Sequence, residues 1–156
     1  MNARYDLVQS LEVAEHLSST SADQFVLNLV KHGDMVLFSA APKGQGGDHH
    51  INEQSYDYWR EKFLHHGYEL FDCVRPLLKS NNLVEPWYRY NIFLYVSTSS
   101  NIDLPNWVLR HKVPRSATVK DISPIWYKAR KLLVRIIPYS MKNKLAKIKA
   151  KFKVTK

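Results

Sequence analysis

Two groups of side chains in the first third of the sequence have the types and the spacing to hold a metal ion. Glu12, Glu15 and His16 form an E-x-x-E-H pattern, and His49 and His50 lie next to each other in a later, glycine-containing segment. Residues i, i+3 and i+4 are neighbours on a helix, so a helical turn would bring the first three side chains onto one face. Two carboxylates and two imidazoles suit a divalent ion such as Mg²⁺ or Mn²⁺, and the histidines favour the softer metal.

The same residues could act without a metal ion. His16 or His50 would then be a general base that accepts the proton of an acceptor hydroxyl. His49, Asn52 and Glu53 are the residues that we expect to contact that acceptor. A simpler interpretation stays open, because a Glu and a His after a strand can cap the following helix, and adjacent histidines in a glycine-rich loop are often solvated.

Buried strands and an amphipathic helix must position these side chains. The apolar runs Tyr5–Leu11 and Asp34–Pro42 have the pattern of strands, and the second is apolar enough to be covered on both faces of a parallel sheet. The helix between them is expected to begin at Thr20 or Ser21 and to end at Gly33. Its apolar face consists of Phe25, Val26, Leu29 and Val30. This βαβ unit would place the candidate ligands beyond the carboxyl ends of its strands, where open α/β sheets bind ligands.

A second helix and two more strands follow. The helix is predicted to begin after Ser55 and to end at Gly67. Its aromatic residues recur at helical spacing and are expected in the core; they are Tyr56, Trp59 and Phe63. The strands are predicted at Tyr68–Val74 and Asn91–Val96, with a turn or a single helical turn at Glu85–Tyr88 between them.

The composition is that of one folded domain with an uneven charge. Of the 156 residues, 45% are hydrophobic and 24% are charged, which excludes a disordered or fibrous chain. Residues 1–108 carry 8 basic and 13 acidic side chains, whereas residues 109–156 carry 15 basic and 1 acidic. The single cysteine, Cys73, excludes an internal disulfide framework and favours a cytoplasmic location. No apolar run reaches the ~20 residues of a membrane span, and the charged residues near Met1 do not resemble a secretion signal.

The basic C-terminal region is predicted to be separate from the rest of the chain. Ser, Thr, Asn and Pro residues mark a linker, which divides the chain into a body, residues 1–98, and a tail, residues 99–156. Within the tail, Ile125–Ile137 and Met141–Phe152 have the pattern of short basic amphipathic helices. Three interpretations are open: a solvated, partly disordered extension, a surface for anionic membranes through residues 125–156, or a surface for a nucleic-acid backbone. The membrane is favoured among the binding surfaces, because IWYKARKLLVRII is more apolar than a typical nucleic-acid arm.

Five segments within residues 6–96 occur in an order that characterises a known family. They are DLVQSLEVAEHL, GDMVLFSAAP, HHINEQ, SYDYWREKF and EPWYRYNIFLYV. Together they resemble the C-terminal half of a class I S-adenosylmethionine-dependent methyltransferase. The resemblance implies an α/β fold, with a partial Rossmann-like sheet of the family's strands four to seven, flanked by helices and followed by a basic helical tail. Strands four to seven would be Tyr5–Leu11, Asp34–Ala41, Tyr68–Val74 and Asn91–Val96, with strand seven antiparallel and inserted between five and six.

The resemblance also implies a function. The E-x-x-E-H pattern is similar to that of the metal-dependent branch, which includes small-RNA 2′-O-methyltransferases and ubiquinone-pathway O-methyltransferases. This gives Glu12, Glu15, His16 and His50 a metal role, and it assigns Leu11 and Glu12 to the cofactor S-adenosylmethionine. The acceptor would be a hydroxyl of a sugar, a glycolipid or another small molecule. In such a site the ion lowers the pKa of the hydroxyl and holds its oxygen in line with the methyl group.

Two parts of the family pattern are missing from this sequence. The glycine-rich turn after strand one and the acidic residue that ends strand two would both precede residue 1, and Gly44, Gly46 and Gly47 do not open a helix. We therefore expect an N-terminally truncated enzyme that is inactive alone. A complementing N-terminal half or a second copy would cover the bare sheet edge. The alternative is a non-catalytic remnant or interaction protein that docks on an anionic membrane or a nucleic acid through its basic tail.

Overall fold

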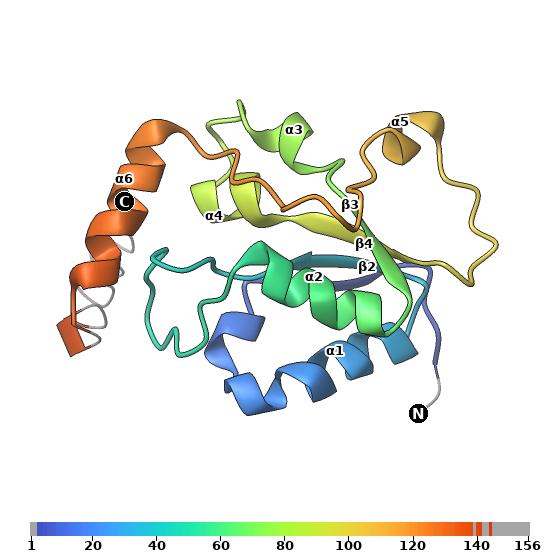
Figure 1. Ribbon diagram of the computed structural model, residues 1–156, viewed down its shortest axis with the longest axis horizontal. Coiled ribbons are helices and arrows are strands. Elements are labelled where there is room, and N and C mark those ends of the chain that lie inside the picture. Colours follow the sequence, from blue (N-terminus) through green and yellow to red (C-terminus); the bar gives the residue numbers. More distant parts are fainter. Residues whose placement is uncertain (1–2, 139, 142–143, 145–156) are drawn as a thin grey trace.

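Four strands form one mixed sheet at the centre of the molecule (Figure 1). The computed structural model describes residues 3–138, 140–141 and 144. The strands are β1 (Val8–Leu11), β2 (Met35–Ser39), β3 (Tyr68–Phe71) and β4 (Phe93–Ser97), and they lie in the order β1-β2-β4-β3. β2 is parallel to β1 and antiparallel to β4, and β4 is also antiparallel to β3. The carboxyl ends of β1, β2 and β3 therefore lie at one end of the sheet, where β4 begins.

Two helices cover one face of this sheet. α1 (Ala22–Lys31) and α2 (Tyr56–His65) lie below the strands in Figure 1 and contribute to the larger core. Phe38 of β2 is buried on this face, and its ring meets the ring of Phe63 edge to face, with 5.2 Å between centroids. The ring of Phe63 also stacks on that of Tyr95, with 3.9 Å between centroids. Each such aromatic pair stabilises the fold by about 1 kcal/mol beyond the area it buries.

The opposite face carries shorter helices and a smaller core. The helices are α3 (Arg75–Leu78), α4 (Pro86–Asn91) and α5 (Asn106–Leu109), which lie above the sheet in Figure 1. The smaller core consists of Phe71, Cys73, Val96 and Val108. β1 is the last strand on its side of the sheet, and Leu7, just before it, is 46% exposed. Within the described residues, the outer edge of β1 is therefore uncovered.

A last helix lies apart from both layers. α6 (Ile125–Ile136) lies beside the loop that connects β2 to α2 (Figure 1). Two short 3₁₀ turns, η1 (Ala14–His16) and η2 (Ser19–Ser21), connect β1 to α1. In the part of the chain that the structure describes, no helix combines the length and the apolar character that crossing a bilayer requires.

The predicted strands exist, but their bounds differ. Three predicted ranges are longer than the observed strands: Tyr5–Leu11, Asp34–Ala41 and Tyr68–Val74. The ends of two of these ranges are bonded elsewhere, because the N–H of Tyr5 donates to the backbone oxygen of His32 over 2.7 Å and that of Asp72 donates to His111 over 2.8 Å. The fourth strand starts two residues later than predicted, because Asn91 still belongs to α4.

The two predicted helix caps have different outcomes. The hydroxyl of Ser55 accepts a hydrogen bond from the N–H of Tyr58 over 3.2 Å, which confirms the predicted start of α2. Ser21 is the N-cap residue of α1, as predicted, but its side chain makes no capping hydrogen bond. The hydroxyl groups of Thr20 and Ser21 instead lie 2.7 and 2.9 Å from that of Ser18, in the 3₁₀ turn that precedes the helix. These hydroxyls therefore stabilise the approach to α1 rather than its first turn.

The region after β4 returns to the sheet. Val108 belongs to the smaller core and Val119 to the larger one. The N–H of Val113 donates to the backbone oxygen of Leu70 over 2.9 Å. Residues 108–119 therefore pack against the sheet, and the domain boundary predicted between residues 98 and 99 stays a prediction.

Of the two helices predicted in the basic region, only the first lies fully within the described residues. The first, predicted at Ile125–Ile137, is α6 and ends one residue earlier. The second, predicted at Met141–Phe152, lies almost entirely outside the described residues.

Candidate functional site

The candidate site lies at the end of the sheet where β1 and β2 finish. Leu11 is the last residue of β1, and the next residue, Glu12, has a positive φ of 54°. The N–H of Glu12 donates to the backbone oxygen and to the hydroxyl of Ser39, the last residue of β2, each over 3.0 Å. Left-handed backbone at a residue other than glycine costs about 1 kcal/mol or more, and these two bonds hold it here. The cofactor contact predicted for Leu11 and Glu12 stays a prediction.

Three of the predicted ligands converge next to this turn. Glu15, His16 and His50 each offer one ligand atom, and these atoms lie within 4.8 Å of one another. The rings of His16 and His50 meet edge to face, with 4.9 Å between centroids. Nε2 of His50 lies 3.9 Å from Oε1 of Glu15. We call these three residues the Glu15 cluster.

The carboxyl group of Glu15 is buried without a hydrogen-bond partner within the described residues. The residue is 0% exposed, and neither side-chain oxygen has a hydrogen-bond partner within the described residues. Burial and, after it, the charge of Glu12 raise the pKa of Glu15 to about 7, and the nearby backbone N–H of Ala41 and the charge of His50 offset this only in part. Near neutral pH, Glu15 is therefore a mixture of the protonated and the charged form. A bound cation would displace the proton and give both oxygens a partner.

Hydrogen bonds assign the ring protons of both histidines. Nδ1 of His16 lies 3.3 Å from the backbone oxygen of His49, and Nδ1 of His50 lies 3.1 Å from Oε1 of Glu53. Both oxygens only accept, so each Nδ1 carries a hydrogen and each Nε2 of a neutral ring has a lone pair. Burial, followed by the charge of His50, lowers the pKa of His16 and keeps its ring neutral at pH 7. A neutral imidazole with this arrangement is suitable both as a metal ligand and as a proton acceptor.

Glu12 belongs to a second, hydrogen-bonded group. Its Oε2 accepts from Nε2 of Gln45 over 2.6 Å, and its Oε1 accepts from Nδ2 of Asn91 over 3.3 Å. Nδ2 of Asn91 also donates to Oε1 of Gln45 over 2.7 Å, and the hydroxyl of Tyr56 donates to Oδ1 of Asn91 over 3.0 Å. Burial raises the pKa of Glu12, whereas the bonds from Gln45, Ser39 and Asn91 oppose that rise. We call Glu12, Gln45, Asn91 and Tyr56 the Glu12 network.

The prediction that one helical face carries Glu12, Glu15 and His16 is wrong for Glu12. Only η1 is helical there, as a 3₁₀ turn, and Glu12 precedes it with left-handed backbone. The carboxylate of Glu12 contacts two amide groups, whereas that of Glu15 lies toward His50. The metal role of Glu12 stays a prediction, and it would require one of the amide groups to give up its bond.

Glu53 holds the glycine-containing loop that follows β2. Its carboxylate accepts from the N–H of Gly44 over 2.7 Å and from that of Gly46 over 2.6 Å, and it also contacts His50. Burial alone would raise the pKa of Glu53, but these three hydrogen bonds outweigh burial and lower it. The charged carboxylate therefore fixes both the loop and the ring of His50. The predicted contact between Glu53 and an acceptor stays a prediction.

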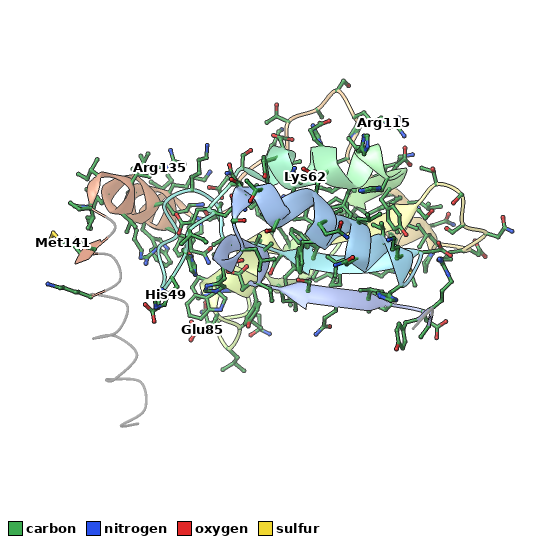
Figure 2. The ribbon with its side chains drawn as sticks, turned by 90° about the horizontal axis from the view of Figure 1, so that it is seen from below. His49, Lys62, Glu85, Arg115, Arg135 and Met141 are labelled. Atoms are coloured by element: carbon green, nitrogen blue, oxygen red, sulfur yellow. The ribbon has the colours of Figure 1, made fainter. Side chains whose placement is uncertain are left out.

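Asn52 and His49 lie at the border of the Glu15 cluster. Asn52 is buried, and its N–H donates to the backbone oxygen of Glu15 over 3.0 Å. Within the described residues, the side-chain nitrogen of Asn52 has no hydrogen-bond partner. His49 is exposed, and Figure 2 shows it toward the same end of the molecule as Arg135 of α6. These positions are compatible with the predicted acceptor contacts, which stay untested.

Three members of the site have no predicted role in the chemistry. The sequence predicts Tyr56 in the core and Asn91 at the start of a strand, and it indicates no role for Gln45. Only one signal points to Asn91: a strand that is antiparallel to β2 must begin at the end of the sheet where β2 finishes, and Asn91 precedes that strand. Gln45 carries no signal, because it meets Glu12 through a loop that has no sequence periodicity.

Comparisons with known proteins give no match. No family profile matches the chain, no curated protein matches its sequence, and no solved structure matches its fold.

Proposed function

We propose that this chain is the acceptor-side half of an S-adenosylmethionine-dependent methyltransferase that methylates a hydroxyl group. The acceptor is a sugar, a glycolipid or another small molecule. One observation carries the proposal: Glu15, His16 and His50 converge beyond the carboxyl ends of two neighbouring parallel strands. Open α/β sheets bind their ligands at this position.

The topology of the sheet supports the proposal. In the resembled family an antiparallel strand seven lies between strands five and six, and β4 lies in the same way between β2 and β3. The family places strands one to three beside strand four, which corresponds to the uncovered edge of β1. The proposed cofactor-binding half would attach at that edge.

The chemistry of the Glu15 cluster fits a divalent ion such as Mn²⁺. A buried carboxyl group without a hydrogen-bond partner and two imidazoles with Nε2 lone pairs form a suitable ligand set. Glu53 orients His50, and the backbone oxygen of His49 orients His16, as outer contacts do for metal-bound histidines. Glu15, His16 and His50 would hold the ion, whose chemistry would be to lower the pKa of the acceptor hydroxyl.

In a site without the ion, where the Nε2 lone pair of His16 is not a metal ligand, proton transfer is assigned to His16. Its lowered pKa keeps the ring neutral, and its Nδ1 hydrogen is directed to His49, so Nε2 is the atom that accepts the hydroxyl proton. S-adenosylmethionine, when bound, would supply the methyl group, and the electron pair of its carbon–sulfur bond would stay on sulfur as the acceptor oxygen bonds to the methyl carbon. His50 is more buried than His16 and Glu53 fixes its ring, so His50 is less accessible to an acceptor hydroxyl than His16 is.

The test uses the chain, Mn²⁺ and a simple glycoside with neighbouring hydroxyls, methyl α-D-mannopyranoside. Bound Mn²⁺ relaxes the protons of its water ligands, and a hydroxyl that displaces water lowers this relaxation. We expect saturable Mn²⁺ binding, and lower relaxation on addition of glycoside, for the unmodified chain but not for Glu15→Gln. His65→Gln, on the exposed last turn of α2, is the matched control and should behave like the unmodified chain.

Two results would contradict the proposal. Equal Mn²⁺ binding by the unmodified chain and by Glu15→Gln would remove the metal role of the cluster. Within the described residues no glycine-rich turn joins a strand directly to a helix, so calorimetric titration with S-adenosylmethionine should show no saturable binding. Tight binding would mean that this chain holds the cofactor itself, and its assignment to the acceptor side would be wrong.

A further inference from the structure

α6 turns its apolar side away from the rest of the molecule. The exposed large apolar residues of this helix are Ile125, Trp126, Leu132, Leu133 and Ile136. Their spacing places them on one side of the helix, and the two at its ends are 85% and 79% exposed. A contiguous exposed apolar surface of this kind marks a site that binds another apolar surface. We call these five residues the α6 stripe.

The opposite side of α6 is held against the loop of the candidate site. Tyr127 and Lys131 are buried, and Lys131 forms an ion pair with Asp121. Arg130 donates to the backbone oxygen of Gln45 over 2.8 Å. A Cβ atom at Gly44 would collide with the backbone oxygen of Lys131, so the loop and the helix are in direct contact. Arg130 and Lys131 thus face the protein together with Tyr127, whereas the large apolar side chains of the α6 stripe face solvent, the reverse of an ordinary surface helix.

The charges around the α6 stripe are positive. Lys128 and Arg135 lie on the helix along one border of the stripe, and α6 contains no acidic residue. The sequence that follows, residues 137–156, adds seven lysines and no acidic residue. An apolar stripe with a tryptophan and a border of lysine and arginine is typical of helices that lie in the headgroup region of a bilayer.

We propose that the α6 stripe docks on an anionic lipid surface. Its leucine, isoleucine and tryptophan side chains would enter the boundary of the acyl chains, while Lys128 and Arg135 would reach the lipid phosphates. Charge complementarity favours lipid over a second copy of the chain, because two copies that met through this stripe would bring their basic residues together. This surface would bind lipid whether or not the Glu15 cluster takes part in methyl transfer.

Vesicle flotation of the full chain tests the proposal. The vesicles consist of phosphatidylcholine alone or of phosphatidylcholine and phosphatidylglycerol in equal parts. We expect binding to the mixed vesicles that weakens at high salt, and weak binding to phosphatidylcholine alone. The double variant Leu132→Ser/Ile136→Ser should lower the partition coefficient at least about tenfold, because it removes two apolar side chains from the stripe.

Two controls separate the stripe from other apolar and basic residues. Leu83→Ser changes a leucine that is 97% exposed in the loop before α4, and it should bind vesicles like the unmodified chain. Because Leu132 and Ile136 are exposed, the double variant should keep the urea midpoint of the unmodified chain. Trp126 provides a second readout, since its fluorescence should shift to shorter wavelength on mixed vesicles, and Trp126→Phe should lose that shift.

Three outcomes would overturn the proposal. The first is an absence of binding to mixed vesicles at low salt. The second is equal binding by the double variant and the unmodified chain, which would assign the affinity to the lysines that follow α6. The third is a dimer in light scattering that the double variant dissociates, with no vesicle binding, which would assign the stripe to a second copy of the chain.

Discussion

The Glu15 cluster and the Glu12 network each contain a buried carboxyl group, but they differ in how that group is hydrogen-bonded. Glu12 accepts hydrogen bonds from two amide side chains, whereas the carboxyl oxygens of Glu15 have no partner within the described residues. Burial raises the pKa of both groups, and for Glu15 the raised pKa is about 7. The two residues are only three positions apart, and the left-handed backbone at Glu12 is what turns them to different partners.

The difference separates buried polar groups that support the fold from those available to a ligand. A fully bonded network stabilises one arrangement of side chains. A buried carboxyl group without a partner costs stability, and a cation that binds it would recover that free energy. The predictions that follow test this contrast.

The largest effect is expected from breaking the Glu12 network. Asn91→Ala leaves a carboxylate oxygen of Glu12 and the amide oxygen of Gln45 without their bonds from Asn91. The hydroxyl of Tyr56 keeps only the backbone oxygen of Tyr90 as an acceptor. We expect the free energy of unfolding to fall by about 3 to 5 kcal/mol, because several buried polar groups lose a partner together. Urea denaturation measures this loss, and Asn101→Ala on the exposed segment before α5 should change it little. A loss as small as that of the control would mean that water replaces the network.

The second largest effect is expected from Glu15→Gln, which should raise the free energy of unfolding. The pKa of Glu15 is raised from its ordinary value of 4.5 to about 7 in the folded chain, so the folded state binds more protons in this range and loses stability as the pH rises through it. Glu15→Gln removes this dependence and should stabilise the metal-free chain by about 2 kcal/mol at about pH 8, but not at about pH 4. Urea denaturation across this range measures the difference. Destabilisation at high pH would mean that the charged carboxylate has partners.

A smaller effect is expected from metal binding. Mn²⁺ at ten times its dissociation constant should stabilise the unmodified chain by about 1.4 kcal/mol. The increase should be larger at about pH 8 than at about pH 6, because the ion competes with the proton on Glu15. Thermal unfolding with and without Mn²⁺ measures it, with Glu15→Gln as the variant that should not respond. A pH-independent increase would place the bound ion elsewhere.

The smallest effect on the free energy of unfolding is expected from removing one hydroxyl group of the Glu12 network. Tyr56→Phe removes only the hydroxyl that donates to Asn91 and leaves the ring against Phe93. We expect a loss of about 1 kcal/mol in the free energy of unfolding and no change in Mn²⁺ affinity, because the Glu15 cluster is intact. Calorimetric titration with Mn²⁺ checks the second part. A change in affinity would show that the network and the cluster act as one unit.

Much of the fold could be predicted because it follows from hydrophobic pattern. The apolar runs located all four strands, and Ser55 located the start of α2. The strand ends could not be located, because residues such as Tyr5 and Asp72 have strand-like neighbours but form hydrogen bonds outside the sheet. The orientation of α6 could not be predicted either, since an amphipathic pattern gives an apolar side without indicating that Tyr127 and Lys131 on the other side are the buried ones.

The candidate site was only partly predictable for a related reason. Glu15, His16 and His50 are residue types that can bind metal ions, which the sequence alone indicates. The structure brings their ligand atoms together. The partners of Glu12 come from a loop and from the start of another strand, so only tertiary contacts reveal them. The left-handed turn at Glu12 likewise depends on Ser39, a distant residue, and not on local propensity.

The close approach of Gly44 to α6 connects this helix to the candidate site. Because Gly44 has no side chain, the backbone of α6 lies directly against the backbone of the loop. Arg130 donates a hydrogen bond to the backbone oxygen of Gln45, the next residue. Gln45 in turn holds the carboxylate of Glu12. Two successive hydrogen bonds therefore connect α6 to Glu12, so a displacement of the helix would act on the carboxylate of Glu12.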